Sequence, residues 1–300
     1  MTESQIGLPP RATPVTVAYL LVTAALAAIF HQTVAQWPAI VIAHITLCVA
    51  LVRLDRTESS SAIVRTLLDW HPILLFPILY KEVELLAAGV GNWGLTEAIP
   101  ALEATLFKGQ PSLYLSERWN SVALSEYLHF CYLSYVLVIP GVCGYWYATR
   151  RLLAFREVVL LLTVTLLGSY LFFILFPVDS PYYRSDRLGP PFAGNFFFDL
   201  VQKISSRGGA RGGAFPSAHA SGAVVIWLMA WRHQRPLAVL LAPIIAGVAV
   251  ATVYGRFHYA LDTMAGLLLA IVVVTVFTIG FSRRHVAQSA SSARRFRSSV

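Results

Sequence analysis

The class of this protein is decided by two apolar runs near its C-terminus, residues 236–254 (PLAVLLAPIIAGVAVATVY) and residues 260–281 (ALDTMAGLLLAIVVVTVFTIGF). A helix that crosses the hydrocarbon core of a bilayer, about 30 Å thick, needs ~20 mostly apolar residues. Both runs approach or meet that length, and only the residues GRFHY at 255–259 separate them. The pattern predicts two membrane helices joined by a short turn.

The composition of the whole chain agrees with a membrane protein. Hydrophobic residues make up 57% of the 300 residues and charged residues 13%, with a mean hydropathy of +0.64. Soluble domains contain about 45–50% apolar and about 25% charged residues, so a soluble globule, a disordered chain and a long coiled coil are excluded. The net charge of +8 would suggest nucleic acid in a soluble protein. Here most arginines lie in short segments between apolar runs, which indicates membrane topology instead, and no nucleic-acid partner is expected.

Six further apolar runs complete the predicted architecture. No clear small-residue cleavage site follows the first of them, which is therefore interpreted as a retained helix rather than a signal peptide. The predicted fold class is all-α, a polytopic membrane bundle of about eight transmembrane helices. The three cysteines fall inside apolar runs, so they are interpreted as small core residues rather than as a disulfide or zinc framework. The six runs are residues 14–31, 37–53, 71–90, 122–147, 156–177 and 217–232.

The chain divides into residues 1–70 with the N-terminal membrane helices, residues 71–281 with the main membrane domain, and a basic cytoplasmic tail at 282–300. Two connections are long. Residues 91–121 mix Trp, Tyr and Leu with a few charges, which is typical of a helix on the membrane surface. Residues 178–216 are rich in Pro, Gly, Tyr and Phe and end in SSRGGARGGAFP, directly before an apolar run.

The distribution of basic residues predicts the orientation. With eight spans, both termini share one side of the membrane, and that side carries fourteen of the 23 Lys and Arg residues, against eight on the other. Short cytoplasmic loops are enriched in Lys and Arg. Both termini are therefore expected in the cytoplasm, and the two long loops in the periplasm, lumen or exterior. Twenty Arg against three Lys indicates a GC-rich genome and hence a bacterial inner membrane.

Two histidine motifs lie at the same predicted membrane face. His258 and Asp262 are four residues apart and share one face of a helix. A carboxylate inside a membrane helix is costly unless it is paired. An Asp bonded to the Nδ1 atom of an imidazole fixes its tautomer and leaves Nε2 as a nucleophile or base. The alternative is an intramembrane pair that only fixes helix packing.

The second motif, Pro216-Ser217-Ala218-His219, opens the run at 217–232. A helix start combines free backbone N–H groups with the positive end of the helix dipole and attracts anions. Glycines nearby allow backbone amides to approach a ligand, and several arginines add positive charge. This set fits phosphoryl transfer, in which one histidine attacks phosphorus and the other protonates the departing oxygen. No carboxylate cluster accompanies the histidines in the sequence, so no metal and no cofactor is expected. The glycines are Gly208, Gly209, Gly212 and Gly213, and the arginines are Arg207, Arg211 and Arg256.

These residues resemble the type-2 phosphatidic acid phosphatase superfamily of membrane phosphatases and lipid phosphotransferases. Its Pro-Ser-x-His motif matches residues 216–219, and its His-x-x-x-Asp motif matches residues 258–262, followed by small residues at 265 and 266. The resemblance implies that His258 is the nucleophile that forms a phosphohistidine, that Asp262 orients it and that His219 is the general acid. It also implies that Ser217 and nearby amides hold phosphate oxygens, although Ser217 could serve only as a helix N-cap.

The sequence departs from the phosphatase pattern at two places. The Lys-x6-Arg-Pro motif is absent, and the segment at 176–184 occupies its position, where Arg184 could supply charge. Thr252 stands six residues before His258, where the family usually has Arg. Both departures resemble the branch that includes inositol phosphorylceramide and sphingomyelin synthases. This branch implies transfer of a phosphoryl head group from a phospholipid to an alcohol. The alternative is hydrolysis of a lipid phosphate, such as phosphatidic acid or a polyprenyl phosphate, with water as acceptor.

Further charged residues lie inside predicted spans, where they mark a functional site by default. Lys81 and Glu84 lie in the third run, and Glu126 and His129 lie in the fourth. The hypothesis is a polar pocket for an acceptor hydroxyl; the alternative is a structural pairing of Lys81 with one of the two glutamates. For Arg256, Arg184 and Arg211, lipid-headgroup contact is the alternative to binding substrate phosphate. A transporter would also carry charges inside a bundle, but it does not require two histidine motifs at one face, and no internal repeat is visible.

Overall fold

The computed structural model describes residues 9–57, 61–184 and 194–297, with side chains described up to residue 280. Every apolar run predicted from the sequence is helical, so the all-α prediction is confirmed, and the described residues contain no strand beyond one isolated bridge between Val178 and Gly213. The helices are α1 (Thr13–Ile29), α2 (Trp37–Arg56), α3 (Ala62–Val90), α4 (Leu95–Phe107), α5 (Pro111–Arg118), α6 (Val122–Ala148), α7 (Leu152–Leu175), α8 (Phe196–Gly208), α9 (Ala218–His233), α10 (Arg235–Tyr254) and α11 (Ala260–Arg297).

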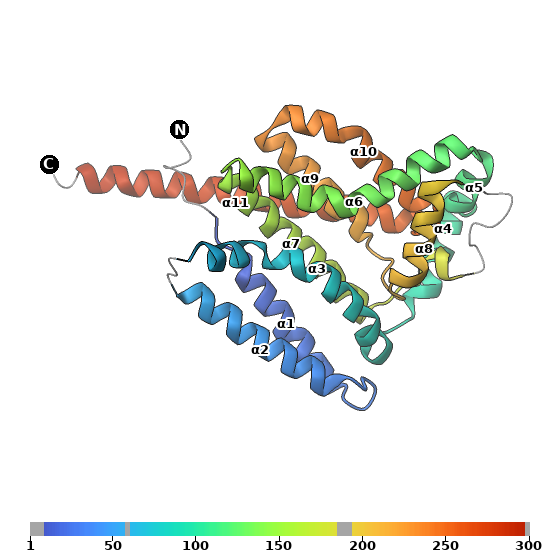
Figure 1. Cartoon of the computed structure of the whole chain (residues 1–300), viewed down its shortest axis with the longest axis horizontal. Helices are drawn as coiled ribbons and strands as arrows, with labels where there is room; N and C mark the ends of the chain where they lie inside the picture. Colours follow the sequence, from blue (N-terminus) through green and yellow to red (C-terminus); the bar gives the residue numbers. More distant parts are fainter. Residues whose placement is uncertain (1–8, 58–60, 185–193, 298–300) are drawn as a thin grey trace.

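Helix α7 forms the centre of the bundle. It is the most apolar of the long helices, and α1, α3, α6, α9 and α11 all pack against it. Most of its side chains are buried, among them Phe155, Leu162 and Phe173, and one face, which includes Val164, stays exposed. A helix that is hydrophobic on all sides is stable only when other helices or lipid surround it. The hairpin of α1 and α2 packs against α3 at the side of this core (Figure 1).

Five of the described helices, α2, α6, α7, α10 and the first part of α11, are long and apolar enough to cross a membrane. Helices α1 and α9 are shorter, at 17 and 16 residues, and α3 carries several charged residues. Large hydrophobic side chains such as Ile78, Leu137 and Leu240 are more than 60% exposed on the outer surface. Exposed apolar area of this kind is covered by lipid in a membrane protein. The total of eight spans stays a prediction.

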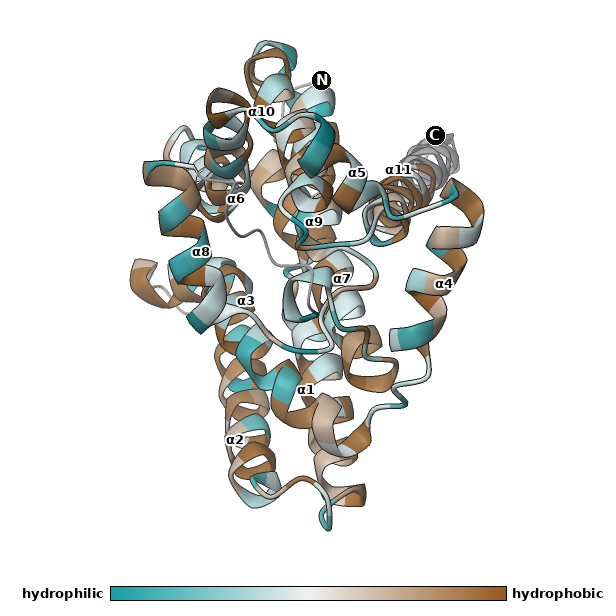
Figure 2. Cartoon of the chain, turned by 90° about the vertical axis from the view of Figure 1, so that its right-hand side faces the viewer, coloured by the Kyte–Doolittle hydropathy of each residue, from teal (hydrophilic) through white to brown (hydrophobic). Residues whose placement is uncertain are grey.

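The two ends of the bundle differ. The first described residues and the C-terminal end of α11 lie at one end, and α4, α5 and α8 lie at the other (Figure 1). Hydrophobic residues cover long stretches of the bundle helices, whereas α4 and α8 carry hydrophilic and hydrophobic residues together (Figure 2). This arrangement places α4, α5 and α8 at the end opposite the first described residues and the last part of α11. The side of the membrane that each end faces stays a prediction.

Several helices differ from the prediction, and α3 begins at Ala62 rather than at residue 71. The single surface helix expected within residues 91–121 is two helices, because Lys108 and Gly109 have positive φ angles of 56° and 153° and end α4 before α5 begins. Helix α8 forms inside the second long connection, which was expected to be a loop. Helix α11 continues to Arg297, because the segment after residue 281 contains neither Gly nor Pro to stop it. The side chains of the basic tail, and Arg187, lie outside the described residues.

Candidate active site

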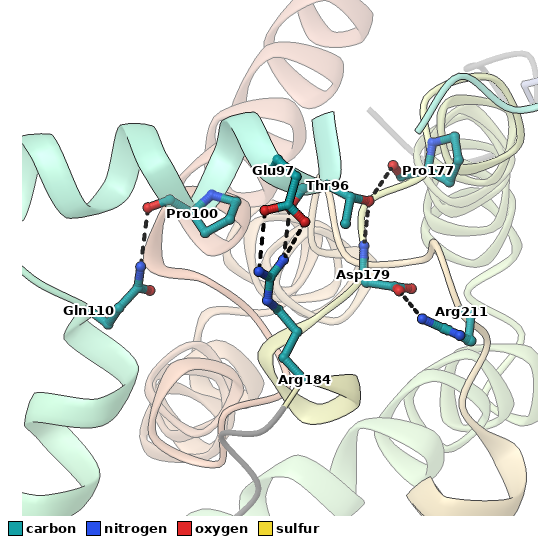
Figure 3. Close-up of polar contacts among 8 residues, drawn as sticks. All are labelled: Thr96, Glu97, Pro100, Gln110, Pro177, Asp179, Arg184 and Arg211. Carbon is teal, nitrogen blue, oxygen red and sulfur yellow. Dashed lines mark hydrogen bonds and ion pairs between the residues drawn. The ribbon is translucent and has the colours of Figure 1, made fainter. Parts of the chain in front are cut away.

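A short connection anchors the start of the first histidine motif. The backbone of Val178 donates to the Gly212 carbonyl at 2.9 Å and accepts from Ala214 N at 3.0 Å. Asp179 accepts a hydrogen bond from Gly212 N at 3.0 Å and pairs with Arg211 (Figure 3). Gly212 has φ +80°, a conformation that a residue with a Cβ rarely adopts. The glycine-rich segment is therefore held against the end of α7 and leads into α9 in one fixed direction.

The start of α9 is joined to the start of α11. Ser217 is the N-cap of α9 and accepts from Ala220 N at 3.3 Å, while its own N–H donates to the Asp262 carbonyl at 2.9 Å. A Cβ atom added at Gly266 would lie 2.5 Å from the Ser217 carbonyl oxygen. The small residue that follows the His-x-x-x-Asp motif therefore has a physical role, because it allows the two helices to approach closely enough for the two motifs to meet.

The rings of His219 and His258 face one small cavity. The ring centroids of His219 and His258 are 5.9 Å apart, and the ring planes make an angle of 61°. Both rings line a cavity of about 50 Å³ together with several tyrosines. Tyr132 stacks on His219 at 4.7 Å between centroids and on Phe257 at 4.3 Å, which fixes the orientation of the His219 ring. This separation suits a phosphorus atom between a nucleophile and an acid that lie roughly in line.

The hydrogen bond that orients His258 differs from the expected one. Its Nδ1 lies 2.8 Å from the Ala214 carbonyl oxygen and 3.6 Å from Asp262 Oδ2. Asp262 Oδ2 instead accepts from Tyr259 N at 2.8 Å, because a carboxylate in the first turn of a helix satisfies free backbone N–H groups. A bond from Nδ1–H to the Ala214 carbonyl still selects the tautomer that leaves Nε2 free to attack. Asp262 lies close enough to stabilise positive charge on the ring.

The three arginines proposed as phosphate ligands point to other partners, and none of them is among the described residues that line the small cavity. Arg256 donates to Ser116 Oγ on α5 at 2.9 Å and 3.0 Å. Arg184 pairs with Glu97 of α4, at 3.1 Å and 3.3 Å (Figure 3). Arg211 pairs with Asp179 and lies over the Tyr183 ring at 5.9 Å from its centroid.

The four charged residues assigned to an acceptor pocket are not brought together. Lys81 Nζ donates to the carbonyls of Arg207 and Gly209, each at 3.3 Å, at the C-terminal end of α8. Glu126 accepts from Asn195 N, Phe197 N and Phe198 N, at 2.8–3.0 Å, at the N-terminal end of α8. A negative charge at the start of a helix and a positive charge at its end both complement the helix dipole. Two helices of the bundle, α3 and α6, therefore hold α8 at its two ends.

The other two members of that set have separate surroundings. His129 is buried, its Nδ1 lies 2.7 Å from the Ser125 carbonyl oxygen, and its ring packs edge-on against Phe198. Glu84 lies near Arg211 and stabilises the charged form of that guanidinium. The predicted cluster is therefore divided. Lys81, Glu126 and His129 contact α8, whereas Glu84 lies beside the glycine-rich segment.

A second, larger cavity opens onto His219. It has a volume of about 590 Å³, lies between α3, α6, α7, α8 and α9, and is lined mainly by apolar side chains such as Phe76, Ile139 and Leu166. Tyr80, Tyr132 and His219 line both cavities, so the larger one lies next to the small one that holds the two histidines. Of the four residues that the sequence analysis assigned to an acceptor pocket, Lys81 lines this cavity. Its apolar walls were not predicted, because they come from five separate helices.

The structure also identifies functional neighbours that were missed. Asp179 holds the glycine-rich segment, and its only signal in the sequence was its place in the segment at 176–184. Glu103 on α4 is fully buried beside the start of α11. Nothing in the composition of the surface helix distinguished Glu103 from an exposed glutamate.

Five of the described helices are long and apolar enough to cross a membrane, and the bundle holds two histidines at one small cavity. These features define the class as an integral membrane protein with a site suited to phosphoryl transfer. A family model, described as the PAP2 superfamily, matches residues 103–276, which is more than half of the chain. The chain therefore belongs to the PAP2 superfamily, and the resemblance drawn from the two motifs is confirmed at that level. Neither a curated protein nor a solved structure matches the chain.

Proposed function

We propose that the protein is a membrane-embedded lipid phosphotransferase that works through a phosphohistidine at the extracytoplasmic face. The observation that carries the proposal is the position of His219 between two cavities. One cavity contains both histidines, and the other is apolar and about 590 Å³ in volume. A substrate with a phosphate and a hydrocarbon chain fits this combination, because its polar and apolar parts face matching surroundings.

The first half of the reaction releases the lipid. His258 Nε2 attacks the phosphorus of a phospholipid head group, and the bond from phosphorus to the glycerol oxygen breaks. His219 gives its proton to that oxygen, and diacylglycerol leaves. Asp262, buried at the start of α11, stabilises the positive charge that develops on the His258 ring.

The second half transfers the head group. His219, now neutral, accepts the proton of an acceptor alcohol as the alcohol oxygen attacks the phosphorus. The bond from phosphorus to Nε2 breaks, its electron pair returns to the ring, and the phosphorylated alcohol leaves.

The surroundings of the small cavity support transfer over hydrolysis of a phosphate monoester. Arg211, Arg184 and Arg256 are engaged with Asp179, Glu97 and Ser116. The cavity lining among the described residues is formed by histidines, tyrosines, Phe257 and small residues. A monoester with two charges requires more nearby cations than a diester head group with one. The position of α4, α5 and α8 at the end opposite the termini supports an extracytoplasmic site with both termini in the cytoplasm (Figure 1).

The experiment is incubation of the purified protein with a panel of phospholipids, each with and without an added polyol or ceramide acceptor. The expected products are diacylglycerol and a phosphorylated acceptor, formed only when the acceptor is present. His258→Ala abolishes both products, and His31→Ala, which changes an exposed histidine in the turn after α1, leaves them unchanged. Release of inorganic phosphate from phosphatidic acid, unaffected by any acceptor, identifies a phosphatase instead. Insensitivity to vanadate, a mimic of five-coordinate phosphorus, identifies a transporter.

A further inference from the structure

Helix α4 carries a buried glutamate on an otherwise largely exposed surface. Among its thirteen residues only Ile99 and Glu103 are buried, and Glu103 has no exposed area. Glutamate is almost never fully buried unless a partner compensates its desolvation. The position of Glu103 therefore requires a physical explanation.

The partner of Glu103 is the start of α11. Glu103 Oε2 accepts a hydrogen bond from Leu261 N at 3.0 Å. Asp262 Oδ2 accepts from Tyr259 N in the same turn. The first N–H groups of a helix have no partner within the helix. Here two carboxylates from different helices each accept a hydrogen bond from one of these groups. One of these carboxylates belongs to the His-x-x-x-Asp motif, and the other comes from a surface helix about 160 residues earlier.

The two carboxyl groups act on each other. Within the described part of the chain, neither Glu103 Oε1 nor Asp262 Oδ1 has a hydrogen-bond partner, although both atoms are buried. Burial is the largest cause that raises the pKa of Glu103, and the negative charge of Asp262 adds to it. The backbone N–H groups of Leu261 and Ala260 oppose this increase, and the resulting pKa is about 7. The charge of Asp262 therefore favours the protonated form of Glu103, because two nearby carboxylates in a buried site cannot both ionise at low cost.

Helix α4 is itself fixed to the glycine-rich side of the site. Thr96 donates to the Pro177 carbonyl at 3.2 Å and accepts from Asp179 N at 3.2 Å, and Glu97 pairs with Arg184 (Figure 3). The same helix therefore contacts the segment that positions α9 and the turn that positions α11. A shift of α4 would move the supports of both histidines.

We infer that Glu103 is a positioning residue for phosphoryl transfer, which holds the first turn of α11 so that Asp262 and His258 keep their places beside His219. This inference rests on the proposed function for its chemistry. Glu103 does not line either cavity, so it acts through α11 and not on the substrate. Removal of its carboxyl group should lower the rate of the chemical step and leave substrate binding almost unchanged.

Three variants and a control test the inference on the purified full-length chain. Glu103→Gln keeps a carbonyl oxygen that can accept from Leu261 N. Glu103→Asp keeps the charge but withdraws it by one methylene group, and Glu103→Ala removes the acceptor. Thr105→Ala is the matched control, because Thr105 is an exposed residue of α4 whose hydroxyl bonds to the Ala101 carbonyl in the same helix. Diacylglycerol and inorganic phosphate are both measured, from a fluorescent phospholipid with acceptor and from phosphatidic acid.

The expected result is a loss in kcat of about 10-fold or more for Glu103→Ala and Glu103→Asp, with KM within about 2-fold, because the acceptor of the hydrogen bond from Leu261 N is lost or misplaced. Glu103→Gln recovers most of the rate, and Thr105→Ala matches the wild type. If Glu103→Ala fails to fold, the comparison of the Gln and Asp variants decides. A kcat for Glu103→Asp equal to that of the wild type overturns the inference. If the wild type releases only phosphate, the transferase proposal fails, and the same comparison is made on the phosphate rate.

Discussion

Substitution of Gly266 by alanine provides a direct test of how the two motifs are aligned. The added Cβ would lie 2.5 Å from the Ser217 carbonyl oxygen, whereas ordinary contact begins at 3.4 Å, so α9 and α11 must separate by about 0.9 Å. The atom in the way belongs to the backbone and cannot rotate aside. Overpacking of this kind costs about 1–3 kcal/mol of stability. A misplacement of about 1 Å between reacting groups costs on the order of 100-fold in rate.

The assay is the initial rate of diacylglycerol release, measured together with the melting temperature in detergent. Gly280→Ala is the control, because a Cβ at this position of the same helix meets nothing within 4 Å. Gly266→Ala should lose about 100-fold in rate with a lowered but cooperative melting transition, and Gly280→Ala should lose neither. A Gly266→Ala enzyme with the rate of the wild type would show that the close approach of α9 and α11 does not set the distance between the histidines.

Three further predictions follow from the site. With a labelled donor that has a good leaving group, His219→Ala should still form phosphohistidine, because an acid is needed least when the departing oxygen is already a stable anion. His258→Ala should form none. Label on histidine in the His258 variant would reverse the roles of the two histidines. Glu126→Gln and Lys81→Met should each speed tryptic cleavage within α8 by about 2- to 5-fold, because each removes a charge that complements the helix dipole. Unchanged cleavage would contradict the view that these two residues hold the ends of α8. The folded state binds the Glu103 proton more tightly than the unfolded state. The stability of the wild type should therefore fall as pH rises from about 4.5 to about 7 and then stay constant. This dependence, about 3 kcal/mol, should be absent from Glu103→Gln in melting curves between pH 5 and pH 8.

Local sequence patterns predicted the helices and the meeting of the motifs well. Hydrophobic runs of sufficient length can only be buried as helices in lipid, so the bundle followed from composition and spacing. The spacing of His258 and Asp262 on one helix, and of His219 at a helix start, indicated the site before any coordinates were known. These features depend on residues that are close in the sequence.

Contacts between residues far apart in the sequence could not be predicted in this way. The partner of His258 Nδ1 is the carbonyl of Ala214, which is 44 positions away, and a backbone atom leaves no mark on the sequence. Lys81 and Glu126 were grouped because both are charged and intramembrane, whereas they hold opposite ends of α8. Glu103 was missed because its burial depends on how α4 lies against α11.

The bond between Ser217 N and the Asp262 carbonyl has an evolutionary consequence. It uses main-chain atoms only, so a change of side chain does not remove its donor or its acceptor, except proline at 217, which lacks the N–H group. A side chain at 266 would still press on the Ser217 backbone and strain the bond. The relative placement of the two motifs is therefore robust to mutation of the residues around the substrate. Side chains that line the cavities can vary through many generations while the reacting groups stay in register. A scaffold of this kind can accept different substrates while the two motifs keep their relative placement.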